Sequence, residues 1–212
     1  MSISMPDRIY AELRSKILSH ELAPSSSLKI EALSERFHTS AIPVREALAR
    51  LCKEGLAVQE NRLGFTVRPV TPISLEDDYR TLAAILQLAA AEVTGKCKPT
   101  QANDEGIALE DLTRTDGAEK LDQFLLGCLP SKQLAGLGAF CLLHSRYFQR
   151  IDFDLRGEKG LRSFISRRQR AAAALIAGKV SIAQKLIAEE RDWRIENIPS
   201  VIREMLFRQL SV

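Results

Sequence analysis

Two short helical patterns follow one another closely near the N-terminus, and few small folds accommodate them. Ile30, Leu33 and Phe37 place three apolar side chains on one face of a helix over residues 30–37. The next helix is predicted to begin about four residues later, at Pro43, because proline fits a first turn where its missing N–H is not needed. So short a connection lets the two helices cross near a right angle, as in a helix-turn-helix.

The flanking residues complete a small folding unit. Upstream, an apolar residue recurs at every fourth position from Ile9 to Ile17 and predicts another helix. Downstream the period changes, and the β-prone runs 56–60 and 65–70 are joined by a glycine-containing turn that is typical of a hairpin. We therefore predict a winged helix-turn-helix domain over residues 1–70.

The remainder, residues 75–212, is predicted to be an antiparallel all-helical bundle, so the fold class is mainly α. Thr71–Ser74 reads as the domain boundary, and Ser74 with Asp77 resembles a capping box that begins a long helix near residue 75. Glycine and proline turn signals separate the later helices. The expected ranges are 75–95, 102–114, 117–129, 131–150, 158–177, 179–197 and 199–210.

Composition limits the class of protein. The 212 residues are 45% hydrophobic and 27% charged, as in soluble globular proteins, and suffice for two ordinary domains. The sequence contains neither a secretory signal nor an apolar run long enough to span a bilayer, so we expect a cytoplasmic protein with no membrane partner. The four cysteines lie far apart, which argues against a disulfide framework or a zinc knuckle.

The net charge of the chain is mildly basic and is only weak evidence for nucleic-acid binding. The net charge is +3, and residues 1–70 carry 10 Lys and Arg against 8 Asp and Glu. Any nucleic-acid binding must therefore depend on where individual charges lie.

The helix that begins at Pro43 carries the functional prediction. A major groove admits one helix, and residues near the N-terminus of that helix reach base edges. Arg45 points away from the apolar face and is the best candidate for a guanine or phosphate contact, whereas an arginine on the hairpin tip suits a narrow minor groove. The predicted DNA-contacting residues are Lys29, Arg36, Ser40, Ala41, Ile42, Arg45, Arg50, Lys53, Arg62 and Gly64.

These residues also carry a resemblance to a known family. The run PVREALxxLxxEGL, with Leu33-Ser-Glu before it and Gly64-Phe-x-Val after it, resembles the GntR family of bacterial regulators over residues 6–70. The helical remainder resembles the effector-binding domain of the FadR subfamily, known as the FCD domain. The resemblance implies a homodimer that binds a pseudo-palindromic double-stranded operator and responds to a small-molecule effector.

The turn departs from the family pattern at three positions. His38 stands where glycine is preferred, and histidine tolerates a positive φ better than most residues do. Ala41 replaces an arginine that commonly reads a base, and Ile42 replaces a hydroxyl residue, so the operator should differ from the usual one or be read less specifically. Ile42 could instead contact a thymine methyl.

The resemblance also implies a divalent metal held by one Asp and several His residues. Asp122 matches the aspartate, but Leu126, Arg168 and Glu190 stand where histidines are expected, so we predict no metal and no other cofactor. Arg168 could supply a fixed positive charge for an organic acid instead. The candidate effector residues are Asp122, His144 and Arg168, although a solvated helix face and a structural histidine remain the simpler interpretations.

Three other functions are conceivable for such a chain. Catalytic motifs are absent from the sequence, so we expect no enzyme. A winged helix that binds protein, with the bundle serving only to dimerise, stays open because of Ala41 and the mild charge. Redox sensing at Cys52 is disfavoured because no basic neighbours mark a reactive thiol.

Overall fold

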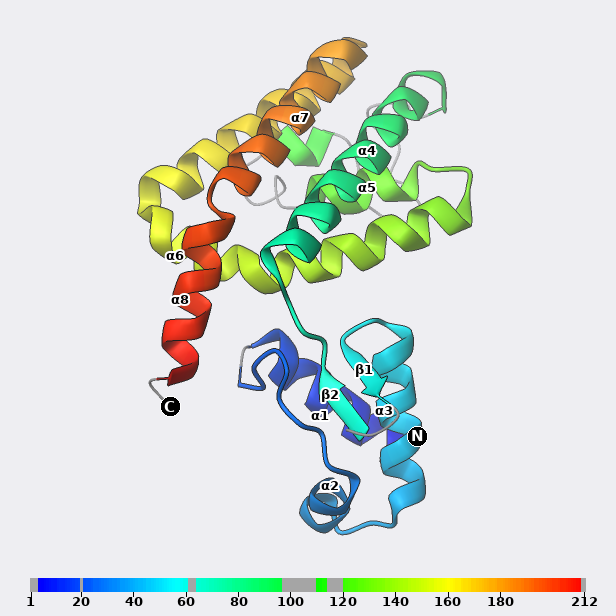
Figure 1. Cartoon of the computed structure of the whole chain (residues 1–212). Coiled ribbons are helices and arrows are strands. Elements are labelled where there is room, and N and C mark those ends of the chain that lie inside the picture. The colour runs from blue at the N-terminus through cyan, green and yellow to red at the C-terminus, as the bar shows by residue number, and fades with distance from the viewer. Residues whose placement is uncertain (1–3, 20, 61–63, 97–109, 114–119, 211–212) are drawn as a thin grey trace. The chain divides into compact units, whose positions relative to one another are not determined.

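The computed structural model describes residues 4–19, 21–60, 64–96, 110–113 and 120–210. The chain divides into two compact units, residues 1–71 and 72–212. The first is a winged helix-turn-helix and the second is helical (Figure 1). Of the helices described, none combines the length and apolar character that crossing a lipid bilayer requires.

The first unit is built on three helices, α1 (Met5–Leu18), α2 (Ile30–Phe37) and α3 (Ala41–Lys53). The predicted apolar stripes form its core, and α1 packs directly against α3. The third helix begins two residues before Pro43, the start predicted from sequence. Proline is tolerated there because the first four N–H groups of a helix have no partner within the helix.

A hairpin of β1 (Ala57–Glu60) and β2 (Gly64–Val67) follows, with Ala57 opposite Val67. The chain before α2 lies alongside β2, where Leu28 N donates to Phe65 O at 2.7 Å. The hairpin is therefore fastened to the segment that leads into α2.

The second unit is a bundle whose main helices are α4 (Pro72–Lys96), α6 (Lys132–Ile176) and α7 (Val180–Glu196). The prediction that Ser74 caps α4 was wrong, because the helix begins at Pro72, a residue favoured in the first turn. These three helices pack on one another around a core of Leu, Ile, Ala and Phe side chains.

Three shorter elements complete the bundle: a 3₁₀ turn η1 (Glu110–Thr113), α5 (Leu121–Gly127) and α8 (Ile198–Leu210). The helix expected near 102–114 lies mostly outside the described residues, and within them only the 3₁₀ turn is present. Helix α5 is shorter than the expected range of 117–129, and residues 117–119 lie outside the described chain.

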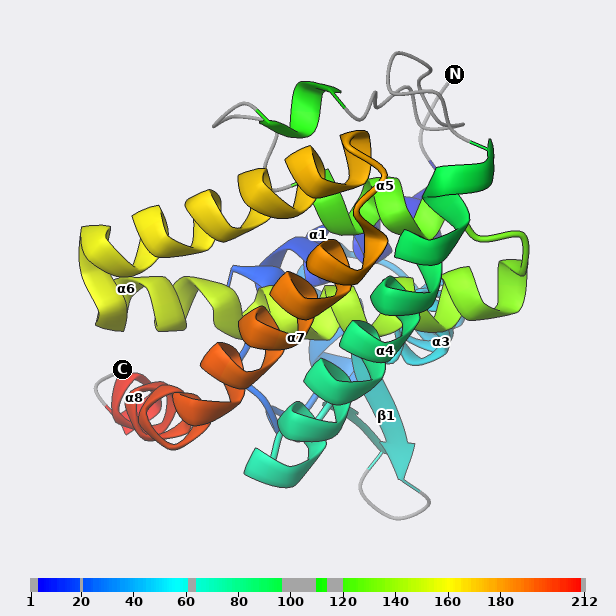
Figure 2. The same cartoon turned by 90° about the horizontal axis from the view of Figure 1, so that it is seen from above.

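Helix α6 consists of two arms that meet at Gly157. This residue has φ 61° and ψ −165°, a conformation open essentially to glycine alone. The second arm runs back along the first (Figure 2). The sequence-based prediction of two helices with a turn at Gly157 is thus confirmed, although the first arm extends past residue 150.

Candidate functional site

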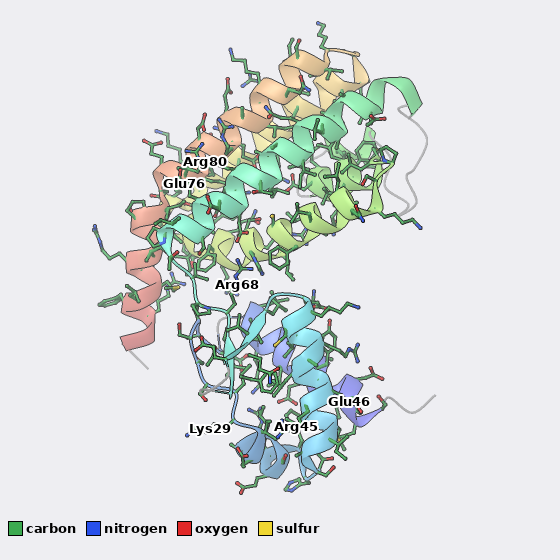
Figure 3. The ribbon with its side chains drawn as sticks, turned by 45° about the vertical axis from the view of Figure 1, so that its right-hand side comes forward. Lys29, Arg45, Glu46, Arg68, Glu76 and Arg80 are labelled. Atoms are coloured by element: carbon green, nitrogen blue, oxygen red, sulfur yellow. The ribbon has the colours of Figure 1, made fainter. Side chains whose placement is uncertain are left out.

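Helix α3 has one buried face and one exposed face. Val44, Ala47, Leu48 and Leu51 are fully buried against the rest of the first unit. Their spacing leaves Arg45 on the exposed side (Figure 3), and Arg50 and Lys53 are exposed as well. The helix is 13 residues long, so at about 1.5 Å per residue it presents a rod of about 20 Å.

The N-terminal half of the exposed face combines a cation with apolar groups. Arg45 is exposed and has no hydrogen-bond or ion-pair partner within the described chain. Ala41 is also exposed, and Ile42 leaves 68% of its surface open to solvent. This face can offer one unpaired guanidinium group beside a bare apolar side chain.

The start of α3 has hydrogen-bonding groups that the fold does not use. Ser40 occupies the N-cap position, but its side chain makes no cap hydrogen bond. Its hydroxyl and the first backbone N–H groups of the helix therefore remain able to meet an anion.

Two of the predicted contact residues form ion pairs across the first unit. Arg50 Nη1 lies 2.5 Å from Asp7 Oδ1, and its guanidinium group stacks over Tyr10. Arg36 Nη2 lies 2.6 Å from Glu12 Oε1. All four charged groups are near the surface, where such pairs contribute little to stability and can be exchanged. The hydrogen bond and charge of Asp7 hold the pKa of Arg50 above its ordinary value.

Lys29 and Lys53 are exposed and, like Arg45, have no partner among the described residues. Lys29 is the N-cap residue of α2, on the segment that pairs with the hairpin (Figure 3). Lys53 ends α3. Three of the predicted cations are therefore uncommitted, and they lie at separate points of the surface.

A contact that the sequence did not predict joins α1 to the end of α3. Glu54 accepts hydrogen bonds from the Tyr10 hydroxyl and, at 3.2 Å, from Arg14 Nε. Burial and then the bond to Glu54 raise the pKa of Tyr10. Because these partners are about 40 residues apart, no local pattern marks them.

The hairpin supplies less information. Gly64 is exposed at the start of β2 with φ 75°, a backbone conformation that favours glycine. Arg62 lies outside the described residues, so its predicted minor-groove role stays a prediction.

His38 adopts the left-handed conformation that its position in the turn demands. It follows α2 with φ 49° and ψ 52°, and its N–H donates to Glu35 O. The expectation that a histidine here accepts a positive φ is confirmed. Residues with a Cβ atom are destabilised in this conformation by about 1 kcal/mol or more, whereas glycine is not.

Glycine in place of His38 should raise the free energy of unfolding by about 1 kcal/mol, because glycine is the residue of choice at this position after a helix. Thermal denaturation of the full chain measures it, with His38→Ala as the control that should bring no gain. A melting temperature that falls with His38→Gly would contradict the strain argument.

The second unit contains a buried cluster of charges at the predicted Asp122 and Arg168. Arg168 Nη2 lies 2.6 Å from Asp122 Oδ2 on α5 and 2.9 Å from Glu190 Oε1 on α7. Arg194 binds the same Glu190 oxygen at 3.1 Å. The side chain of Arg168 is 4% exposed, so the two carboxylates neutralise it in the interior.

Glu190 stays ionised over most of the pH range. Burial raises the pKa of Glu190, but the charges of Arg168 and Arg194 outweigh it and bring the pKa to about 2. That value lies below 4.5, its ordinary value. The ion pairs of Glu190 therefore stabilise the fold fully above about pH 4.5, and their contribution falls as the pH drops toward 2.

These residues do not fit a metal ion. The guanidinium group of Arg168 already lies against both carboxylates and would repel a divalent cation. Within the described ranges, no three His, Cys, Asp or Glu side chains are grouped to hold one. Nor is Arg168 the unpaired cation that the sequence suggested for an organic acid.

His144 is buried in a different pair. Its Nδ1 lies 3.2 Å from Asp78 Oδ2 on α4, and its ring packs edge-on against Phe140. Of the three candidate effector residues, the structure brings Asp122 and Arg168 together and pairs His144 with another carboxylate.

Comparison with known proteins finds similarity in the first unit. Residues 6–67 match the family described as bacterial regulatory proteins, gntR family. Over 81 residues the chain is 41% identical to the HTH-type transcriptional regulator BphR of Paraburkholderia xenovorans, covering 38% of this chain and 31% of that protein. Over 69 residues it is 38% identical to an HTH-type regulator of Streptomyces ambofaciens, covering 32% and 29%. The matches span about a third of these relatives' length.

Solved structures resemble the whole chain in fold. A GntR protein of Rhodococcus sp. RHA1 matches with a TM-score of 0.66 at 19% identity, covering 92% of this chain and 97% of its own. McbR/YncC of E. coli matches with a TM-score of 0.61 at 21% identity, covering 94% and 99%. The arrangement of a winged helix followed by a helical unit is therefore shared.

Proposed function

We propose that this chain is a transcriptional regulator of the GntR type that binds operator DNA with α3 in the major groove; the match of residues 6–67 to that family and their winged-helix fold support the proposal. The observation that carries the proposal is the exposed face of α3 with its unpaired Arg45. A helix of this length and exposure fits a groove about 12 Å wide.

Most of the candidate residues have a stated role in this proposal. Arg45 contacts a guanine or a phosphate, and Ile42 contacts a thymine methyl. Ser40 and the start of α3 meet a phosphate. Lys29, Lys53 and, on the hairpin, Arg62 add phosphate contacts.

Arg36 and Arg50 belong to the same proposal despite their ion pairs. Both pairs lie near the surface, with the Arg50 and Asp7 side chains each about half exposed. An exposed pair of this kind is worth at most about 1 kcal/mol, so a phosphate can replace the carboxylate at little cost.

The proposals on dimerisation, operator symmetry and effector binding rest on the resemblance to the family. We propose a homodimer that places two copies of α3 on the half-sites of a pseudo-palindromic operator. The helical unit would bind a small-molecule effector and thereby alter the affinity for DNA. A relation to the FadR subfamily is part of this proposal.

A protein-binding winged helix is the second candidate. The bare side chain of Ile42, 68% exposed beside Ala41, favours it, because an exposed apolar group at the start of a helix also suits a protein partner. Salt dependence separates the two functions, since only phosphate contacts release counterions.

The full-length protein should bind random duplex DNA with an affinity that falls steeply as salt rises. With several phosphate contacts per subunit, the plot of log affinity against log salt should have a slope of about −4 or steeper. Fluorescence anisotropy between 50 and 200 mM salt, ordinary conditions for such a titration, measures it. A flat plot would leave the protein-binding role as the better explanation.

A further inference from the structure

A cavity of about 600 Å³ opens between the two arms of α6 and the start of α5. Its volume lies within the range of small-molecule sites. Arg146, Gln149, Arg150 and Phe153 line it from the first arm, and Lys120 lines it from the residue before α5. The buried Asp122–Arg168 pair forms part of its wall.

The positive charges of this cavity are not balanced by the described chain. Lys120, Arg146 and Arg150 are exposed and have no ion-pair partner among the described residues. Of the two carboxylates that line the cavity, the buried Asp122 pairs with Arg168, and Asp154 pairs at the surface with Arg208 at 3.0 Å. Three cations therefore line the same space, and none of them pairs with a carboxylate within the part of the chain that the structure describes.

The spacing of these residues makes a recognition surface. Positions 146, 149, 150 and 153 follow the i, i+3, i+4, i+7 pattern, which places them on one face of the first arm. Gln149 adds an amide to the two guanidinium groups. The ring of Phe153 packs 5.0 Å from that of Phe164 on the second arm and gives an apolar wall.

We propose that this cavity binds a small multivalent oxyanion, namely a phosphomonoester or a di- or tricarboxylate, and that this anion is the effector of the regulator. The effector role, unlike the binding site itself, rests on the function proposed above. Guanidinium groups present paired donors that match phosphate and carboxylate oxygens. A monoanion would leave two of the three cations unpaired, so the site selects ligands with at least two negative charges. Arg168 shapes the wall but contributes no free charge.

The test uses the full-length protein and three multivalent probes, namely inorganic phosphate, glucose 6-phosphate and citrate, with acetate as the monoanion. The variant is Arg146→Gln/Arg150→Gln. The control is Arg170→Gln/Arg203→Gln, which removes the same charge from two exposed residues that do not line the cavity. Titration calorimetry measures binding, and circular dichroism checks that both variants keep the helical fold.

At least one multivalent probe should bind the wild type and the control equally, and the cavity variant at least tenfold more weakly, with acetate binding none of them. Tight binding of citrate alone identifies carboxylates as the source, and binding of the two phosphates identifies phosphoryl groups. Equal binding to both variants, or no binding of any multivalent probe, overturns the site. If a probe binds in the cavity but leaves the affinity of the protein for DNA unchanged, the effector role is refuted. If a probe binds in the cavity but the protein does not bind DNA at all, the proposed function is refuted and the anion site stands.

Discussion

Alanine in place of Arg168 should lower the free energy of unfolding by about 3–5 kcal/mol. The substitution leaves Asp122 buried without its guanidinium partner and removes one of the two cations beside Glu190. Buried carboxylates that lose their counter-charge must either stay charged in a poor solvent or take up a proton, and both outcomes destabilise the fold. Urea denaturation of the full chain, followed by circular dichroism, measures the change.

The matched control for this prediction is Arg162→Ala on the same arm of α6. Arg162 pairs with Glu158 at the surface, with side chains 74% and 84% exposed, so its loss should cost less than about 0.5 kcal/mol. The double variant Asp122→Ala/Arg168→Ala should be less destabilised than the sum of its two single variants, because it leaves one stranded charge fewer. Equal stability of Arg168→Ala and Arg162→Ala would show that the cluster contributes nothing.

Alanine in place of Arg45 should weaken binding to the preferred operator by about 1–3 kcal/mol, roughly fivefold to 150-fold. Arg45 is the cation on the N-terminal half of α3 that the described chain leaves unpaired, so no internal contact is lost with it. The operator is first selected from a random duplex library with the wild type. Anisotropy titrations of both proteins against that operator and against random DNA give the difference.

The pattern of the loss identifies the atom that Arg45 contacts. A base contact predicts relaxed preference at one position, and a phosphate contact predicts uniform weakening with a salt slope reduced by about one. Arg170→Ala, an exposed arginine of the helical unit, should bind as the wild type does. Unchanged affinity and preference in Arg45→Ala would remove α3 from the interface.

Much of the fold was predictable because its signals are local. Apolar residues at helical spacing predicted all three helices of the first unit, and the change of period predicted the hairpin. Helix starts were less accurate, because several residues near a start can supply a plausible cap. Ser74 resembled one, yet α4 begins at Pro72, and α3 begins two residues before its proline.

The candidate site was predictable only where the pattern of a single helix determines which side chains are exposed. The exposure of Arg45 follows from the burial of Val44 and Leu48 on either side, which a single pattern predicts. The commitment of Arg168 to Asp122 and Glu190 depends on three helices that meet, across 46 and 22 residues of sequence. The resemblance to the FadR subfamily placed those residues in one neighbourhood, but it gave no means of knowing that their charges cancel.

The chain reverses direction at the single residue Gly157, so no flexible linker separates the two arms of α6. One inserted residue would turn the second arm by about 100°, since a helix makes a full circle in 3.6 residues. That rotation would carry Arg168 away from Asp122 and would leave the cavity without the wall they form. The short junction therefore fixes the rotation of the second arm about its axis relative to the first. Insertions and deletions in this unit should then be tolerated at other positions.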